Sequence, residues 1–274
     1  MLYHHLESIH KTAEFMECYE SCHKCDVAIL SVFFILCYLG INRKGRFKKE
    51  RTQKMKKNGT KILFYGFMLI VAFIIWTASI QIVNVRPIGP NGSRVGFASF
   101  NRWFHQLTGV HMTLYTVTDW LGLLPVFVCT IFGGIGFFQL IKRKSLRNVD
   151  YDLLLLGIYY ITVIVGYLIF EIVPINFRPV LIEGRLEASY PSSTTLLVLC
   201  VMPTLVEQTN RRSKKAAVKR IIKNLAACFS IAMVIGRLLS GVHWFTDIMG
   251  AVILSIGLFF CYKAAVLLCN RKKR

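Results

Sequence analysis

The chain alternates long, uncharged apolar runs with short segments rich in lysine and arginine, and few folds accommodate such an alternation. An α-helix rises about 1.5 Å per residue, so about 20 residues cross the ~30 Å hydrocarbon core of a bilayer. The pattern predicts an all-α, polytopic membrane helix bundle with six core transmembrane helices and a short extra helix on the N-terminal side. The core runs are 62–83, 120–141, 153–170, 194–206, 221–235 and 248–262, and the shorter run is 27–41.

The composition argues against two other classes of protein. Of the 274 residues, 54% are hydrophobic, and 34 lysines and arginines stand against 14 acids, a formal net charge of +20. Disordered chains have low hydrophobicity, so disorder is not predicted. A nucleic-acid-binding domain interleaves its lysine and arginine residues with aromatic and polar groups, whereas here the basic and the apolar residues are segregated along the chain. We therefore expect a lipid bilayer, and no nucleic acid, among the partners.

The positive charge fixes an expected orientation. Four segments hold 26 of the 34 bases but only 4 of the 14 acids, namely 43–61, 142–152, 207–223 and 263–274. If all seven runs span, these segments share one side, which the positive-inside rule makes cytoplasmic. We expect a multi-pass protein of the plasma membrane with a cytoplasmic C-terminus, and three outward segments at 84–119, 171–190 and 239–247.

Runs and charges together divide the chain into four parts. We predict a polar extension over 1–26, a short apolar helix and basic cytoplasmic loop over 27–61, a six-helix membrane domain over 62–268, and a basic cytoplasmic tail over 269–274. The extension holds Cys18, Cys22 and Cys25 beside His23, a set that suits a zinc or iron–sulfur site. Outside the membrane the three thiols would equally well oxidise, and no second ligand pair follows at a typical spacing. No metal site is therefore predicted.

The second outward segment ends in a pattern typical of a helix N-terminus. Pro191 is followed by the small hydroxyl residues Ser192, Ser193 and Thr194, and then by an apolar run. Such a terminus presents free backbone N–H groups and a positive dipole end, which together bind anions. Arg178 supplies a cation upstream in the same segment. The hydroxyl residues would also serve simply to cap a transmembrane helix.

The third outward segment adds a histidine and a carboxylate. His243 and Asp247 stand four residues apart, so they share a face if a helix begins near His243. A carboxylate bonded to one imidazole nitrogen fixes the tautomer and leaves the other nitrogen free as a nucleophile or base. Arg237, at the outer end of the preceding run, is suited to bind phosphate through two parallel hydrogen bonds.

These residues together resemble a known family. Arg178-Pro179, Pro191-Ser192-Ser193 and Arg237-x5-His243-x3-Asp247 are similar to the three motifs of the type 2 phosphatidic acid phosphatase superfamily, also called lipid phosphate phosphatases. The family's pattern is Lys-x6-Arg-Pro, then Pro-Ser-Gly-His, then Ser-Arg-x5-His-x3-Asp. The resemblance covers about residues 62–268, and its third motif is the most specific. It implies six core helices with the motifs on the outer face.

The resemblance also implies a role for each matching residue. His243 would attack phosphorus and form a phosphohistidine, and Asp247 would orient His243. The phosphate oxygens would be bound by Arg178, Arg237 and Ser192, and by Ser193 and Thr194 at the N-terminus of the following helix. No metal ion or cofactor is required.

Three positions depart from the family's pattern. Glu171 stands where the first motif has Lys, Thr194 where the second has His, and Gly236 where the third has Ser. The family's second-motif His protonates the leaving oxygen, which a threonine hydroxyl is too weak an acid to do. Loss of a general acid typically costs about 10²–10⁴-fold in rate. Substitute acids are therefore expected among His111 and Glu187, with His105, Glu183 and Tyr190 as further candidates.

Three functions remain open at this stage. The first is a phosphatase or phosphotransferase acting on a lipid phosphate or isoprenyl diphosphate at the outer face. The second is a catalytically impaired member that binds or scaffolds lipid phosphates, which Glu171 and Thr194 favour. The third is a transporter or channel, which is disfavoured because no charged residue lies deep within an apolar run.

Residues 97–107, in the first outward segment, mix aromatic and basic residues. This mixture is typical of a short amphipathic helix in the membrane interface. Such a helix would guide a lipid headgroup or simply anchor the protein through its aromatic side chains.

Overall fold

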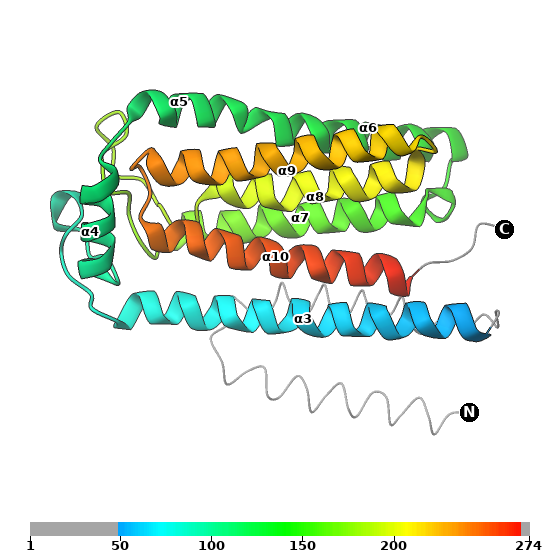
Figure 1. Ribbon diagram of the computed structural model, residues 1–274, viewed down its shortest axis with the longest axis horizontal. Coiled ribbons are helices and arrows are strands. Elements are labelled where there is room, and N and C mark those ends of the chain that lie inside the picture. The colour runs from blue at the N-terminus through cyan, green and yellow to red at the C-terminus, as the bar shows by residue number, and fades with distance from the viewer. Residues whose placement is uncertain (1–48, 270–274) are drawn as a thin grey trace, which may run out of the picture. The chain divides into compact units, whose positions relative to one another are not determined.

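The computed structural model describes residues 49–269, with side chains from residue 56 onward. The predicted short helix at 27–41, the cysteine- and histidine-containing extension and most of the C-terminal tail lie outside these residues. Within them the secondary structure is helical apart from isolated β-bridges, which confirms the all-α membrane bundle. Its long helices run side by side in Figure 1: α3 (Lys49–Ile82), α5 (Met112–Leu121) continued by α6 (Leu123–Arg143), α7 (Tyr151–Ile172), α8 (Ser193–Arg212), α9 (Ala216–Leu239) and α10 (Phe245–Leu268).

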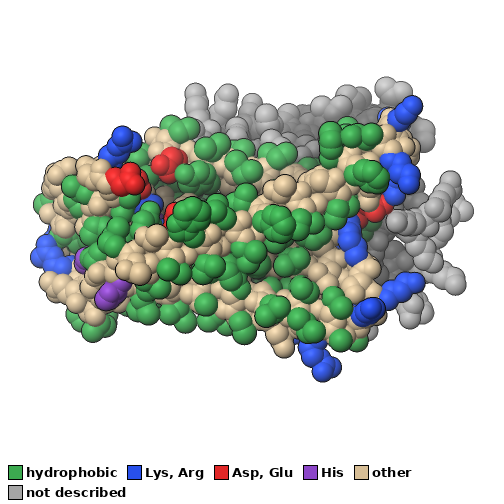
Figure 2. Space-filling view, turned by 90° about the horizontal axis from the view of Figure 1, so that it is seen from above, with side chains coloured by type: hydrophobic (Ala, Val, Ile, Leu, Met, Phe, Trp, Pro, Cys, Tyr) green, Lys and Arg blue, Asp and Glu red, His purple; other side chains and the backbone are tan. Residues whose placement is uncertain are grey.

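Length and composition mark this bundle as an integral, multi-pass membrane protein. Five spans in the described residues are long and apolar enough to cross a bilayer: Lys56–Ile82, Met112–Arg143, Tyr151–Ile172, Ala216–Leu239 and Phe245–Leu268. Large apolar side chains such as Phe127, Phe138 and Ile161 are exposed on the outside of the bundle. Figure 2 shows apolar side chains covering the middle of one face, with lysine and arginine towards its ends. A bilayer is the solvent that this surface fits.

The helix α8 differs from the others because its polar groups point inward. Thr195, Thr204 and Gln208 are fully buried in α8. Thr204 pairs with the Tyr160 hydroxyl at 2.7 Å, and the Gln208 amide donates to the Tyr262 hydroxyl at 3.0 Å. These contacts hold the polar side chains of α8 against α7 and α10, so the helix belongs to the bundle although it is less apolar than its neighbours.

The helices α3 and α10 approach closely because of two glycines. A Cβ on Gly66 would lie 2.8 Å from the Cys261 sulfur, and a Cβ on Gly257 would lie 3.0 Å from Ile70. Real Cβ atoms essentially never lie as close as the first distance and seldom as close as the second, so glycine permits the close approach, as small residues do between membrane helices. Towards one end, Phe73 of α3 stacks on Tyr190 with ring centroids 6.0 Å apart.

The connections 83–97, 173–192 and 240–244 lie at one end of the bundle, here called the α4 end because α4 (Ala98–Thr108) lies across it in Figure 1. A helix was predicted over 97–107, and α4 is that helix. Its Phe100 and Phe104 rings both lie 5.1 Å from Phe245, the first residue of α10. The Asn101 amide donates to Thr246 at 3.0 Å. The α4 helix therefore holds the N-terminus of α10 in place.

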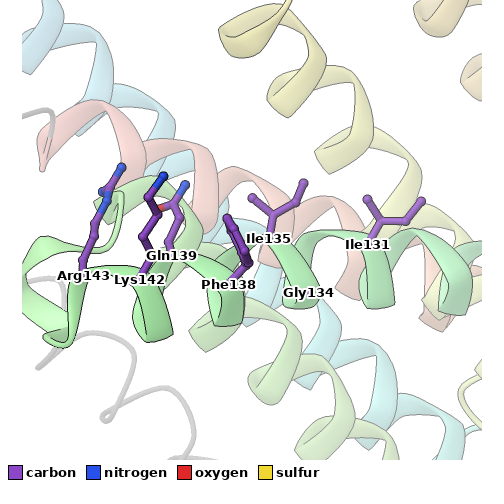
Figure 3. Close-up of a pocket in the computed structure, with 7 residues that line it drawn as sticks. All are labelled: Ile131, Gly134, Ile135, Phe138, Gln139, Lys142 and Arg143. Carbon is purple, nitrogen blue, oxygen red and sulfur yellow. The ribbon is translucent and has the colours of Figure 1, made fainter.

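The opposite end of the bundle is fixed by ion pairs and has a groove on its surface. Arg143 pairs with Asp150 at 3.2 Å, and Arg212 pairs with Asp152 at 2.8 Å. A groove of about 750 Å³ runs along α6 there (Figure 3), lined by Ile131, Gly134, Ile135, Phe138, Gln139, Lys142 and Arg143. The lining includes Lys142 and Arg143 but no histidine, cysteine or carboxylic acid, so the groove is not taken as the candidate active site.

Candidate active site

The candidate residues of the second and third outward segments meet at the α4 end. Arg178 lies in the connection between α7 and α8, Arg237 in the last turn of α9, His243 in the short connection that follows, and Asp247 in the first turn of α10. All four are buried. Two of them, Arg178 and His243, line a cavity of about 240 Å³, here called the His243 cavity, whose other lining residues include Tyr167, Glu171, Glu187, Ser189 and Ser193. Arg237 and Asp247 are not among the residues that line it.

The hydrogen bonds of His243 identify its tautomer. Its Nδ1 lies 3.1 Å from the carbonyl oxygen of Ser189 and 3.1 Å from the Ser189 hydroxyl. A carbonyl oxygen can only accept, so Nδ1 bears the proton. The Nε2 atom lies 3.3 Å from Nη2 of Arg237, which can only donate. The neutral ring therefore has its lone pair on Nε2.

Positive charge and burial keep His243 neutral. Burial is the main cause that lowers the pKa of the imidazole well below its ordinary value, and the charges of Arg178 and Arg237 lower it further. The hydrogen bond to the Ser189 carbonyl acts in the opposite direction. A neutral imidazole with an unprotonated Nε2 is the form that acts as a nucleophile.

The sequence had led us to expect a direct hydrogen bond between the Asp247 carboxylate and His243. The structure has no such bond. The helix α10 begins only at Phe245, so His243 precedes it and the geometry of residues four apart in a helix does not apply. Instead Ser189 donates its hydroxyl proton to Asp247 and lies between the two residues. Asp247 also accepts from the backbone N–H of Trp244 at 3.0 Å and from the Asn176 amide at 3.1 Å.

Two buried guanidinium groups flank the ring of Tyr115. The Arg237 carbon Cζ lies 4.8 Å and that of Arg178 5.7 Å from its centroid. Arg237 approaches Asp119 and Thr118 at 3.5 Å each. Arg178 forms an ion pair with Glu187 at 3.1 Å.

Both guanidinium groups also retain N–H groups that no protein acceptor satisfies. In the described chain, Nη1 of Arg178 and Nε of Arg237 are buried without a hydrogen-bond partner. A buried N–H without an acceptor is costly. An anion bound in the His243 cavity would satisfy the donor of Arg178, because guanidinium groups form strong hydrogen bonds with phosphate.

The predicted hydroxyl residues divide into two groups. Ser193, the first residue of α8, lines the His243 cavity. Ser192 is fully buried, its hydroxyl donates to Thr195 at 3.0 Å, and its backbone N–H donates to the Asp247 carbonyl at 3.2 Å. The methyl group of Thr194 lies near Gly122, where α5 meets α6. Ser192 and Thr194 are thus placed in packing positions, and they are not among the residues that line the cavity.

Of the five candidates for a substitute acid, two line the His243 cavity and three lie elsewhere. Glu187 lines the His243 cavity, and so does the ring of Tyr190, whose hydroxyl pairs with Thr77 at 2.7 Å. Glu183 is exposed. His111 is exposed and its Nε2 lies 3.0 Å from the Thr108 carbonyl. His105 lies 3.0 Å from the Gly241 carbonyl, where it supports the connection that contains His243.

Several residues of this arrangement had been given no role on the basis of the sequence, although Ser189 was noted among the polar residues of the second outward segment. The candidate residues are contacted by Ser189, Asn176, Tyr115 and Asp119. None of these four residues belongs to a recognisable sequence motif. Ser189 immediately precedes the Tyr190-Pro191 pair, and that nearness to the second motif was the one available signal. Their roles depend on contacts between segments that are far apart in the chain.

In the part of the chain that the structure describes, no group of three or more histidine, cysteine, aspartate or glutamate side chains is placed to hold a metal ion. The cysteine and histidine residues of the N-terminal extension lie outside that part.

Comparisons with known proteins identify a family and a similar fold. The family model of the PAP2 superfamily matches residues 128–271, which include Arg178, Arg237, His243 and Asp247. The fold is similar to that of a transmembrane PAP2-type phosphatidylglycerolphosphate phosphatase from Bacillus subtilis, with a TM-score of 0.54 and 20% identity over 73% of this chain and 94% of that one. No curated protein matches the chain. Because the family model covers more than half of its length, the chain belongs to the PAP2 superfamily.

Proposed function

We propose that this protein is an integral membrane phosphatase or phosphotransferase that acts on a lipid phosphate or diphosphate through a phosphohistidine intermediate. The observation that carries the proposal is the environment of His243. Its Nδ1 is held by Ser189, and its Nε2 lone pair lies beside the Arg237 guanidinium, in a connection that borders the cavity. A nucleophile next to a phosphate-binding cation is the arrangement that phosphoryl transfer requires.

The reaction takes place in two steps. In the first, the Nε2 lone pair forms a bond to phosphorus while the P–O bond of the substrate breaks, and the leaving oxygen takes the electron pair and a proton. In the second, the oxygen of water, or of an alcohol in phosphotransfer, attacks phosphorus. The N–P bond breaks and its electron pair returns to Nε2. The attacking oxygen loses its proton to solvent or to a nearby base.

Arg178 and Arg237 stabilise the charge on the transferring phosphoryl group. Both are buried, and their free N–H groups are already oriented before the substrate binds. Ser193, at the N-terminus of α8, adds a backbone N–H and the positive end of the helix dipole. Removal of one such donor typically costs about 10²–10³-fold in kcat.

Protonation of the leaving group favours particular substrates. Thr194 replaces the family's acid and does not line the His243 cavity, whereas Glu187 does. Glu187 forms an ion pair with Arg178 at 3.1 Å, and a carboxylate in such a pair has no proton to donate to an alkoxide. A diphosphate needs less help because phosphate is a better leaving group than an alkoxide. An isoprenyl diphosphate is therefore the preferred substrate class.

The distribution of charge supports an outward-facing site in the plasma membrane. The end of the bundle opposite the His243 cavity contains the basic segments 142–152 and 207–223. By the positive-inside rule that end is cytoplasmic, together with the C-terminus, so the substrate enters the cavity from the outer leaflet.

Phosphate release by the purified protein in detergent tests the proposal. Phosphatidate and an isoprenyl diphosphate are supplied separately, and His243→Ala is expected to lower the rate by at least about 10³-fold because the nucleophile is lost. Ser255→Ala is the matched control, since Ser255 is fully buried in α10, its hydroxyl donates to the Ala251 carbonyl, and it does not line the His243 cavity. If His243→Ala turns over either substrate at the wild-type rate, the phosphohistidine mechanism is wrong.

A second function is favoured by one observation. Glu171 lines the cavity at the position where the family's first motif has lysine, so a negative charge lies beside the phosphate route. A member that binds lipid phosphate without hydrolysis would show saturable binding of phosphatidate in detergent, and no phosphate release over a broad substrate panel. Replacement of Glu171 by lysine would then raise affinity without creating turnover.

A further inference from the structure

We propose that Ser189 is a positioning residue that couples the nucleophile His243 to the carboxylate of Asp247. This inference rests on the proposed function and concerns the same site. The sequence pattern suggests that the carboxylate and the imidazole pair directly, whereas in the structure the serine hydroxyl lies between them.

A count of protons gives the direction of each hydrogen bond. The Ser189 hydroxyl has one proton, and Asp247 as a carboxylate can only accept. The proton therefore points to Asp247, and the serine oxygen is left to accept from the Nδ1–H of His243. The Ser189 carbonyl oxygen accepts from the same Nδ1–H. One residue thus fixes the tautomer twice, through its backbone and through its side chain.

Asp247 is held where only the serine can connect it to the ring. Its Oδ1 accepts from the Asn176 amide at 3.1 Å, and its Oδ2 accepts from the Trp244 backbone N–H at 3.0 Å as well as from Ser189. All the groups that take part are buried. These bonds hold the carboxylate away from His243, so its negative charge reaches the imidazole through the Ser189 hydroxyl.

The backbone of Ser189 is itself fixed by neighbouring contacts. Its N–H donates to the Asn176 carbonyl at 2.9 Å, and an adjacent bridge pairs Phe177 with Ala188. The segment that contains Arg178 therefore also orients the serine. A loss of the hydroxyl alone leaves this backbone, and the carbonyl bond to Nδ1, in place.

This coupling matters when the ring becomes positively charged. Bond formation between Nε2 and phosphorus leaves a positive charge on the imidazole, and Nδ1 keeps its proton throughout. The Nδ1–H bond to Ser189 then strengthens, because the serine is polarised by the carboxylate that it donates to. The serine therefore stabilises the phosphohistidine and the transition state that leads to it, and it contributes little to binding of the substrate.

The first test separates catalysis from binding. Ser189→Ala is expected to lower kcat, and the rate at which the phosphohistidine forms after rapid mixing, by about 10–100-fold, as is typical when a residue that orients an active group is removed. KM should change by less than about twofold, because the substrate contacts remain. Ser255→Ala, the loss of another buried hydroxyl, should leave kcat unchanged. A wild-type kcat per folded Ser189→Ala molecule would overturn the inference.

The second test is a double-mutant cycle with Asp247→Asn. If the charge of Asp247 acts through Ser189, Asp247→Asn slows the wild type strongly but slows Ser189→Ala by less than about threefold. If Asp247→Asn lowered kcat by the same factor in the wild type and in Ser189→Ala, Asp247 would act without the serine. Should Asp247→Asn fail to fold, the kcat of Ser189→Ala alone decides. His243→Ala keeps the two proposals apart: normal turnover in that variant overturns the proposed function, whereas equal factors in the cycle overturn only the role of Ser189.

Discussion

At the scale of single residues, His243 lies in surroundings that oppose its protonation. It is buried beside two arginines, one of which donates to its Nε2. A proton on Nε2 would meet the donor of Arg237, and it would also remove the lone pair that attacks phosphorus. The two arginines that we propose to bind the phosphate therefore also favour the neutral imidazole that the proposed mechanism needs.

This environment predicts the acid limb of the pH–rate profile. The folded-state pKa of His243 is lowered, so the neutral ring persists below the ordinary histidine pKa of about 6.5. In the free enzyme kcat/KM should stay level as the pH falls through 6.5 and decline only at lower pH, because kcat/KM reports groups of the free enzyme. The measurement is phosphate release at low substrate concentration between pH 4 and 8, after brief incubation to confirm stability.

The control for this prediction uses the charge of an arginine. Arg178→Gln removes one of the two cations that lower the His243 pKa, so the acid limb of its residual activity should move to higher pH. A limb that begins above pH 7 in the wild type would contradict the assignment of a neutral, charge-flanked nucleophile.

Residue spacing predicted the members of the site better than their contacts. The Arg-x5-His-x3-Asp spacing identified Arg237, His243 and Asp247, which the structure brings together. The direct bond between His243 and Asp247 was wrong, because it assumed a helix that begins two residues too early. The role of Ser189 depends on the fold of the 173–192 connection beside α10. Long-range contacts of this kind leave no periodic signal in one sequence.

At the scale of elements, α4 and the start of α5 clamp the connection that contains His243. The backbone N–H of His111 donates to the Ser240 carbonyl at 2.9 Å, and His105 Nε2 lies 3.0 Å from the Gly241 carbonyl. Gly241 has φ 69°, and a Cβ there would lie 1.9 Å from the Gly109 carbonyl oxygen. The position therefore needs glycine for its backbone conformation and for the close approach of the two connections.

Substitution of this glycine should disturb the nucleophile without touching the cavity. Gly241→Ala is expected to lower both the unfolding temperature and kcat, the latter by at least about tenfold, because a small misplacement of a reacting group is costly. Gly184→Ala is the matched control: Gly184 has φ 76°, but its Cβ would meet nothing within 4 Å. Its cost should be limited to the positive φ, about 1 kcal/mol of stability. Equal effects of the two substitutions on kcat would exclude a clamp.

The helices themselves followed from the apolar runs, and the differences at their ends have physical reasons. The run 194–206 was short because Glu207 ends it and Gln208 and the arginines of the last turn follow, yet α8 continues to Arg212. Its polar side chains face α7 and α10 rather than lipid, so uncharged length underestimates such a helix. The run 120–141 likewise left out most of α5, because the polar residues Thr118 and Asp119 precede the run. Both of these residues face Arg237.

At the scale of the whole molecule, charge and chemistry are placed at opposite ends of the helices. The connections at the α4 end include the residues around the His243 cavity, whereas 142–152 and 207–223 hold 11 bases and 3 acids. The net charge of +20 thus says little about the substrate. It bears instead on which side of the membrane the cavity opens.

Orientation is the last prediction and can be measured in intact cells. An epitope inserted after Asn91, in the turn at Pro90–Gly92, should be reached by antibody without permeabilisation, because we propose that the α4 end faces outward. An epitope at the C-terminus should be reached only after permeabilisation. Both tagged proteins must keep phosphate release, so that only correctly folded chains are scored. The reverse pattern would place the His243 cavity on the cytoplasmic side, and the substrate would then come from the inner leaflet.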